Sequence, residues 1–526
     1  MRVIRSGLHR LILLTAVLGL TVTGCRAASS SDQEDLSPEG YGVFYEIFPY
    51  TFYDSDGDGI GDLQGIIEKL DYIQDGGRSA DDLGANGIWL MPVMPSPTYH
   101  KYDVKDYYSI DPEYGTLEDF DELVAEAEVR DLDIIIDLVL NHSSSEHPWF
   151  LEAAEGLATG QESKYSGYYN FSDQKHSSAW HPVPGSDRYY EGVFWSAMPD
   201  LNLDNEDLRA EIIAIASFWL ERGVAGFRLD AVTHFYAEDH PRNIEFLRWF
   251  NDTVKALYPE TYIVIEAWDS FPVYTSYLAS GVDSAFDFAF ADNLGLTLRS
   301  VNMEDGASYA ESQINADRRR REVSETAINA PFLTNHDTGR LAGFTASDLD
   351  KTRLAQRLNI LAPGNPFIYY GEELGYRGAG RDENKRAPML WSAGTEGLTA
   401  GPADMERDRI SYPFGSVEDQ TNDPDSILSH VRDTIRFKQR HPALFAGSLA
   451  AVPLDTPQAI AAMALSCQDK TLYLLTNFSN EEAVLDLSGT ELEDLTLSDE
   501  LGFSETAQKD ARQLILPGYH TVLLSD

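Results

Sequence analysis

The chain has 526 residues and is strongly acidic, with 86 Asp and Glu against 40 Lys and Arg and a formal net charge of −46. A chain of this length can bury a large core, and we expect more than one domain. The charge would repel nucleic-acid phosphates and anionic lipid headgroups, so we expect no nucleic-acid partner. A well-solvated surface and adaptation to salt both fit this acidity, and composition leaves the two interpretations open.

Residues 1–24 have the pattern of a secretory signal peptide. Three arginines precede an apolar run over residues 11–20, which is shorter than the roughly 20 residues that span a bilayer. The run is followed by Val-Thr-Gly-Cys, which resembles the lipobox of bacterial lipoproteins. This resemblance implies cleavage before Cys25, a lipid on its thiol, and an extracytoplasmic protein anchored to a bacterial cell membrane; an ordinary signal peptide is the alternative. Residues 25–40, rich in Ser, Ala and acids, are predicted to form a flexible tether.

Between residues 41 and 442, short apolar segments alternate with segments of helical periodicity. This alternation predicts repeated βα units around a parallel sheet. Eight candidate strands occur, which is the number in a (β/α)8 TIM barrel, and we therefore predict an α/β fold of this class. The candidates are residues 43–49, 87–93, 134–140, 226–231, 262–267, 285–290, 331–335 and 366–371.

Two connections in this region are unusually long. Residues 143–199, after the third strand, are predicted to form an inserted subdomain, and residues 374–425 follow the eighth strand. A last helix is predicted over Ser426–Gln439, before Pro442. The pattern then becomes alternating, which predicts an antiparallel β-sandwich domain over residues 445–526.

Polar residues cluster where four of the predicted strands end. They lie in the segments Asp137–His142, Gly226–Asp230, Glu266–Trp268 and Asn335–Asp337. In a barrel these strand ends converge on one face. Several carboxylates in one pocket raise one another's pKa values and lose solvation, so the cluster predicts a catalytic site; a single acid would fit a loop cap or an ion pair.

These segments, with Met198–Asn202 and Gly371–Gly375, resemble the motifs of the α-amylase superfamily of retaining glycoside hydrolases. The resemblance covers roughly residues 41–526, and it is closest to the group intermediate between oligo-1,6-glucosidases and neopullulanases. It implies three catalytic roles: a nucleophile, a general acid/base and a transition-state stabiliser, namely Asp230, Glu266 and Asp337.

The same resemblance implies a set of substrate-binding residues. Tyr102 would stack on the sugar ring, and His142 and His336 would hydrogen-bond sugar hydroxyls. Arg228 would keep Asp230 ionised, because a nearby cation lowers the pKa of a carboxyl group. The implied substrates, starch and maltooligosaccharides, are neutral, so hydroxyl contacts and aromatic faces must supply the affinity. We expect the protein to act as a monomer.

Two positions bear on which bond is cut. Tyr99-His-Lys-Tyr102 resembles the Tyr-His-x-Tyr pattern of endo-acting α-amylases, whereas oligo-1,6-glucosidases have Asp at the place of Tyr99. Ala231, after the nucleophile, resembles the α-1,4 type. We therefore expect endo-hydrolysis of α-1,4-glucosidic bonds by retaining double displacement. The alternatives are an oligo-1,6-glucosidase or α-glucosidase, a neopullulanase-like hydrolase, a transglycosylase, and a non-catalytic sugar-binding lipoprotein.

Alternating acids and glycines over residues 54–62 predict a site for a hard cation with oxygen ligands. An EF-hand would need Glu at the twelfth position of this loop, which is Gly65. The resemblance implies instead a Ca²⁺ loop after the first strand; an acidic surface turn is the alternative. The implied ligands are Asp54, Asp56, Asp58, the Ile60 carbonyl and Asp62. A second calcium site could use Asn141, Asp200 and the His234 carbonyl.

Overall fold

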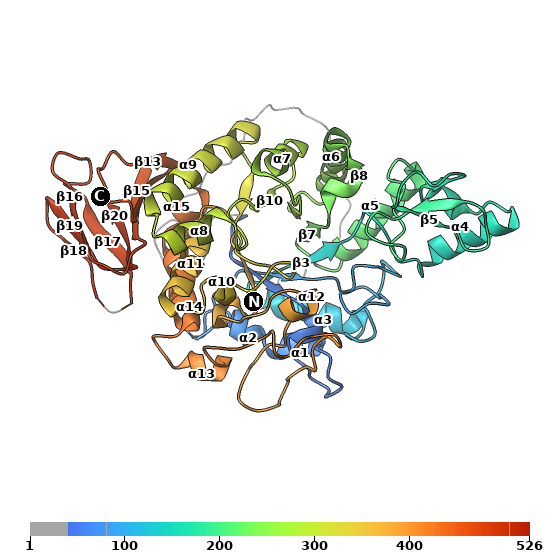
Figure 1. Ribbon diagram of the computed structural model, residues 1–526, viewed down its shortest axis with the longest axis horizontal. Helices are drawn as coiled ribbons and strands as arrows, with labels where there is room; N and C mark the ends of the chain where they lie inside the picture. Colours follow the sequence, from blue (N-terminus) through green and yellow to red (C-terminus); the bar gives the residue numbers. More distant parts are fainter. Residues whose placement is uncertain (1–39, 80, 504) are drawn as a thin grey trace, which may run out of the picture.

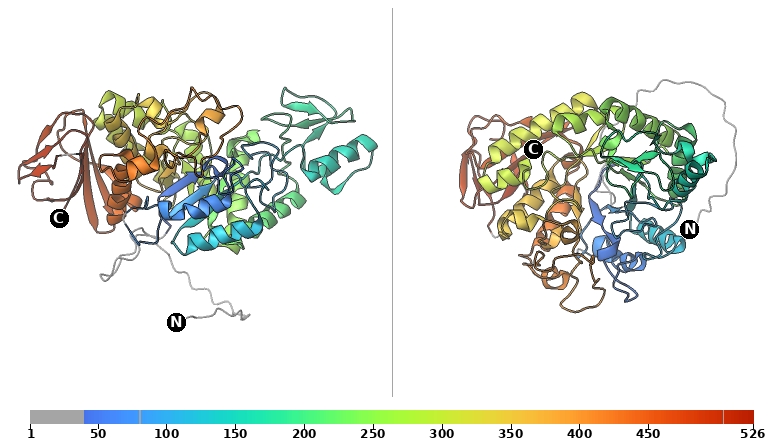
Figure 2. Two further views of the ribbon diagram at one scale, coloured as in Figure 1. Left: turned by 90° about the horizontal axis from the view of Figure 1, so that it is seen from below. Right: turned by 45° about the vertical axis from the view of Figure 1, so that its right-hand side comes forward.

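The computed structural model describes residues 40–526, apart from residues 80 and 504. The predicted signal peptide, Cys25 and residues 25–39 of the predicted tether lie outside these residues. A central barrel lies between an inserted subdomain at one end of the long axis and a C-terminal β-domain at the other (Figures 1 and 2). Among the described residues, no helix combines the length and apolarity needed to cross a membrane.

The barrel consists of eight parallel strands in the order β11-β10-β9-β7-β3-β2-β1-β12. The two outer strands meet through backbone hydrogen bonds from Asn365 N to Asn329 O (2.8 Å) and from Phe367 N to Pro331 O (2.8 Å). The predicted (β/α)8 fold is therefore confirmed. The strands are β1 (Phe44–Ile47), β2 (Gly87–Leu90), β3 (Asp133–Leu138), β7 (Gly226–Leu229), β9 (Tyr262–Ile265), β10 (Ser284–Phe286), β11 (Ile328–Ala330) and β12 (Phe367–Tyr369).

The predicted bounds of the seventh strand are wrong. We expected residues 331–335, but β11 ends before Pro331, which has no backbone N–H to donate to the ladder. The sixth strand likewise ends at Phe286 and not at Phe290. The apolar run in both segments continues into loops, where Phe288 and Phe332 pack edge to face with ring centres 5.1 Å apart. Hydrophobicity marked burial in these segments, but it did not mark where strand pairing stops.

Helices surround the barrel, and polar side chains begin most of the long ones. Thr116 starts α3 with a capping box, and Ser426 starts α14 where the sequence predicted it. The principal helices are α1 (Leu63–Glu68), α3 (Leu117–Glu128), α5 (Glu206–Leu220), α6 (His240–Leu257), α8 (Leu296–Met303), α9 (Gly306–Val323), α11 (Leu349–Leu361) and α14 (Ile427–Arg440). Shorter helices are α2 (Leu70–Ile73), α7 (Phe271–Ser276), α10 (Leu341–Phe344), α12 (Asp382–Lys385), α13 (Val417–Thr421) and α15 (Ala443–Ala446).

Residues 143–199 form a subdomain of one helix and a small sheet. The helix is α4 (Pro148–Thr159), and the strands β4 (Phe171–Ser172), β6 (Tyr189–Glu191) and β5 (Trp180–Pro182) pair antiparallel in that order. Ser143 N donates to Pro199 O (3.1 Å), and Leu201 N donates to Asn141 O (2.9 Å). These bonds tie both ends of the insertion to the chain that leaves β3.

The C-terminal domain consists of two antiparallel sheets. The larger contains β13 (Ser448–Ala451), β14 (Ile460–Cys467), β15 (Lys470–Asn477), β20 (Thr521–Ser525) and β17 (Thr496–Leu501), in that order. The smaller contains β16 (Ala483–Asp486), β19 (Gln513–Leu516) and β18 (Gln508–Lys509). Leu475 and Val522 of the first sheet share one buried cluster with Leu485 and Leu514 of the second. The domain packs on the barrel at α9, where Leu449 N donates to Asp317 (3.0 Å).

Candidate active site

The barrel interior changes from apolar to charged between two successive layers of side chains. Seven barrel strands contribute to a buried apolar cluster, among them Phe44 and Val264. Side chains alternate along a strand, so residues two positions further on face the same interior. Those residues include Glu46 and Glu266, and both are buried. The charged layer therefore lies at the carboxyl ends of the strands, where TIM-barrel enzymes hold their active sites.

Arg228, in β7, lies at the centre of this layer and is fully buried. Its Nη1 donates to Asp137 (2.5 Å) and to Asp230 (2.7 Å), and its Nη2 lies 2.8 Å from Glu266 Oε2. Three buried carboxylates without a cation would be strongly unfavourable, and the guanidinium compensates them. The predicted nucleophile and the predicted acid/base are thus held against two nitrogens of one planar group.

Glu266 and Asp230 have different surroundings. Burial raises the pKa of Glu266 to about 7, with Arg228 opposing the rise and Asp230 adding to it. Ala231 N donates to Glu266 Oε2 (3.0 Å), the oxygen that also faces Arg228, so the acidic proton belongs on Oε1. Burial raises the pKa of Asp230 too, but the guanidinium that donates directly to it favours the charged form. Glu266 is therefore suited to begin protonated and Asp230 to begin ionised.

Asp337 follows β11 and is the most exposed of the three acids, with 28% of its side chain accessible. Arg386 Nη2 donates to its Oδ1 (2.9 Å), and His336 Nε2 lies 3.1 Å from its Oδ2. Burial raises the pKa of the Asp337 carboxyl, but the charges of His336 and Arg386 more than offset this and leave the pKa well below its usual value. Asp337 is thus a permanent negative charge at the rim of the site.

The residues predicted to bind sugar lie around this centre. The Tyr102 ring stacks on His336, with centres 5.5 Å apart and planes at 17°, and its hydroxyl is 2.7 Å from His336 Nε2. Burial lowers the pKa of His142 to about 3, so this histidine is neutral, and its Nε2 lies 3.2 Å from the Tyr102 carbonyl. The structure therefore brings every predicted catalytic and substrate-binding residue to one face of the barrel.

Two residues of the site were missed by sequence reasoning. Glu46 lies in β1 and binds His336 Nδ1 at 2.6 Å, although the sequence around it reads only as a buried strand. Arg386 lies in the long connection after β12, and only the length of that connection hinted at a contribution to the site. Asp137 belonged to a recognised segment but had no assigned role; it pairs with Arg228.

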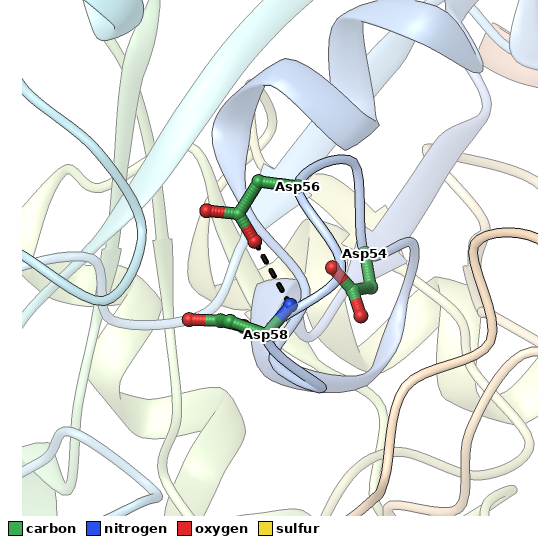
Figure 3. A group of neighbouring side chains, drawn as sticks. All are labelled: Asp54, Asp56 and Asp58. Atoms are coloured by element: carbon green, nitrogen blue, oxygen red, sulfur yellow. Dashed lines mark hydrogen bonds between the residues drawn. The ribbon is translucent and has the colours of Figure 1, made fainter.

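The loop after β1 gathers three of the five predicted metal ligands. The carboxylates of Asp54, Asp56 and Asp58 offer oxygens that all lie within 4.8 Å of one another (Figure 3). Asp62 lies beside them but caps α1 by accepting from Gly65 N (2.7 Å), and it also accepts from Ser55 Oγ (2.8 Å). A cluster of carboxylate oxygens fits a hard divalent cation such as Ca²⁺.

The residues of the possible second calcium site lie together at the base of the insertion. Asn141 Nδ2 donates to Asp200 Oδ1 (3.3 Å), and burial raises the pKa of Asp200 to about 8. Asp200 and His234 line one polar cavity of about 500 Å³. Asn170 and Glu191, from the insertion, also line this cavity and offer further oxygen atoms to it.

A buried acid of raised pKa, a second carboxylate held by arginine, and a third at the rim of a TIM barrel are together the features of a glycoside hydrolase site. The chain belongs to the alpha-amylase family of glycoside hydrolases: the family's catalytic domain matches residues 46–447.

Several relatives are similar over most of their length. Alpha-amylase 3 of Dictyoglomus thermophilum is 35% identical over 485 residues, which cover 92% of each chain. Among solved structures, Eubacterium rectale Amy13B is 38% identical with a TM-score of 0.87, covering 93% of this chain and 96% of that one. The alpha-amylase from H. orenii is 37% identical with a TM-score of 0.82, covering 93% and 100%. Other relatives, 27% to 31% identical, are named as glucosidases or trehalose-active enzymes.

Proposed function

We propose that the protein is an α-amylase that cuts internal α-1,4-glucosidic bonds of starch and maltooligosaccharides and retains the anomeric configuration. The observation that carries this proposal is the approach of Asp230 and Glu266 to one guanidinium. A retaining enzyme needs its two carboxyls about 5–5.5 Å apart, whereas an inverting enzyme needs about 6.5–9.5 Å to admit a water. Two carboxyls on one arginine favour the shorter separation.

The proposed reaction has two steps. Asp230 attacks the anomeric carbon while Glu266 passes its proton to the departing glycosidic oxygen, which leaves a covalent glycosyl-enzyme. A water then attacks the same carbon, Glu266 accepts its proton, and the bond to Asp230 breaks. The charge of Asp337 stabilises the positive charge that develops on the sugar in both transition states.

Exposed aromatic side chains around the site support a long-chain substrate. Trp268, two residues beyond Glu266, is 51% exposed and stacks on Phe288 with ring centres 5.2 Å apart. Phe194, from the insertion, is 45% exposed and lies 5.1 Å from the His234 ring. Because Glu266 protonates the leaving oxygen, rings near it can bind sugars of the departing chain.

The wall near Asp337 supports endo-action. Tyr99 Oη accepts from Arg386 Nη1 (3.2 Å), so an uncharged ring stands where exo-acting glucosidases are expected to carry an acid. Among the relatives, names that include α-amylase occur at 35% to 37% identity. Both points favour amylase over glucosidase specificity.

Product analysis tests this function. We expect starch digestion to release a range of maltooligosaccharides from the start, initially as α-anomers, with little or no action on isomaltose. Glucose released stepwise as the sole product, or isomaltose cut faster than maltotetraose, would assign a glucosidase instead. Products longer than the substrate at high maltooligosaccharide concentration would assign a transglycosylase.

We also propose that Asp54, Asp56 and Asp58 hold Ca²⁺, with the Ile60 carbonyl and Asp62 completing the set. An ion that binds only the folded state stabilises it, by about 2.7 kcal/mol when free Ca²⁺ is 100 times the dissociation constant. Chelation should therefore lower the melting temperature, measured by calorimetry. The matched variant Asp56→Asn, which keeps an acceptor for Asp58 N (3.1 Å), should melt lower and lose its response to chelator.

The calcium proposal fails if the purified protein contains no calcium and its melting curve is the same with and without a strong chelator. The loop also touches the long connection after β12, through hydrogen bonds from Asp54 N to Gly397 O (3.0 Å) and from Ala400 N to Gly59 O (2.7 Å). We therefore expect chelation to increase proteolysis within residues 391–412 as well.

A further inference from the structure

His336 lies between two carboxylates that come from opposite parts of the chain. Its Nδ1 is 2.6 Å from Glu46 Oε1, and both side chains are only 1% exposed. Its Nε2 is 3.1 Å from Asp337 Oδ2 and 2.7 Å from the Tyr102 hydroxyl. Glu46, His336 and Asp337 thus form a continuous line from beneath the site to its rim. We propose that Glu46 is a positioning residue that keeps His336 doubly protonated and, through it, holds Asp337 ionised and correctly oriented.

The proposal follows first from donors and acceptors. An ionised carboxylate only accepts hydrogen bonds, and a neutral imidazole carries one N–H and one lone pair. A neutral His336 would therefore direct a lone pair at either Glu46 or Asp337. The Tyr102 hydroxyl lies 3.2 Å from Asp137 Oδ2, to which it donates, so it accepts from His336 and does not replace the missing proton. Only the doubly protonated imidazolium can donate a hydrogen bond to both carboxylates.

Charge leads to the same protonation state. Burial lowers the pKa of His336, but Asp337 and Glu46 outweigh this and raise it to about 9. Burial also raises the pKa of Glu46, and His336 opposes that rise. Because Asp337 places a second negative charge on the other edge of the ring, the shared proton belongs to His336.

Charged groups from the other strands do not replace Glu46. Asp137 from β3 and Arg228 from β7 act on this pair through space with opposite signs. Arg386, from the connection after β12, donates its Nε to the His336 carbonyl (3.1 Å), and the Trp89 ring packs edge-on at 5.6 Å. Nδ1 is bound by Glu46, so loss of that carboxylate removes the charge nearest to this nitrogen.

Glu46→Gln tests the proposal, with Glu373→Gln as the matched control. Glu373 is also fully buried and accepts from Tyr45 (2.6 Å) and Tyr72 (2.8 Å) away from the catalytic acids. We expect Glu46→Gln to lower kcat roughly 10–100-fold, the size of effect found for residues that orient metal-ligating side chains, with little change in KM. The control should keep the kcat and the pH profile of the wild type.

The protonation of His336 separates positioning from a structural role. In the wild type, activity should fall as Glu266 loses its proton near pH 7, because His336 stays charged to about pH 9. Without Glu46, only Asp337 is left to oppose burial, so the pKa of His336 should fall below its wild-type value. In Glu46→Gln, ¹⁵N NMR of histidine-labelled protein should show a His336 midpoint at least about one unit below that of the wild type, a shift that a purely structural role would not produce. An unchanged midpoint, whatever the loss in kcat, would overturn the proposal.

A second measurement follows the wild-type protein without substrate, and a variant serves only to assign the signal. In wild-type protein labelled with ¹⁵N-histidine, the His336 signal, assigned by its loss in His336→Asn, should remain that of an imidazolium up to pH 8. A midpoint near the ordinary value of about 6.5 would refute the proposal. The inference rests on the proposed role of Asp337. The titration does not depend on which substrate the enzyme cuts, so it distinguishes a wrong substrate assignment from a wrong role for Glu46.

Discussion

Asp230→Asn should lower kcat on maltoheptaose by at least roughly four orders of magnitude. The substitution preserves shape but removes the charged oxygen that attacks the anomeric carbon. Arg228 keeps its contacts with Asp137 and Glu266, so the centre of the site should remain folded. KM should change little, because the sugar-binding groups are untouched.

Initial rates and thermal melting of the same preparation check this result. Asp133→Asn is a suitable control, because Asp133 begins β3 at the opposite end of the barrel and is exposed. It should retain wild-type kcat. If Asp230→Asn folds and turns over at the wild-type rate, another residue is the nucleophile.

Glu266→Gln should lower kcat on maltooligosaccharides by about 10²–10⁴-fold, the usual contribution of a general acid. Because glutamine has no proton to give, the loss should depend on the leaving group. A 4-nitrophenyl α-maltoside needs little protonation to depart, so its first step should be far less affected. Water attack still lacks a base, and a burst of nitrophenol from accumulated glycosyl-enzyme is expected.

The sign of the pH dependence follows from the raised pKa of Glu266. The acid must be protonated, so wild-type activity is present below about pH 7 and declines as pH rises through that value. In Glu266→Gln this decline of activity above about pH 7 should disappear, as measured by single-turnover rates of the aryl substrate. Equal losses on aryl and natural substrates, with the decline retained, would show that Glu266 is not the acid.

The barrel, and the places of the three acids proposed to be catalytic, could be predicted from the amino-acid sequence. The βα alternation predicted the barrel, because a buried parallel sheet requires apolar strands separated by amphipathic helices. Asp230, Glu266 and Asp337 stood at the ends of predicted strands, and barrel topology alone brings such ends to one face. The βα alternation and the positions of the acids depend on local residue pattern and on the order of elements along the chain, and both can be read from the sequence.

The groups that charge and orient those acids come together only in the folded chain. Glu46 and His336 are 290 residues apart in the chain, and Tyr99 and Arg386 are 287 apart; each pair meets only because the barrel closes. Nothing in the local pattern distinguishes Glu46 from any acid in a strand, since its role depends on which side chain faces it across the interior. The pKa of Glu266 likewise depends on burial and on Arg228, Asp230 and Asp337, which belong to two other segments. Protonation at this site is therefore a property of the folded neighbourhood, because desolvation and Coulomb interactions depend on distances that exist only after folding.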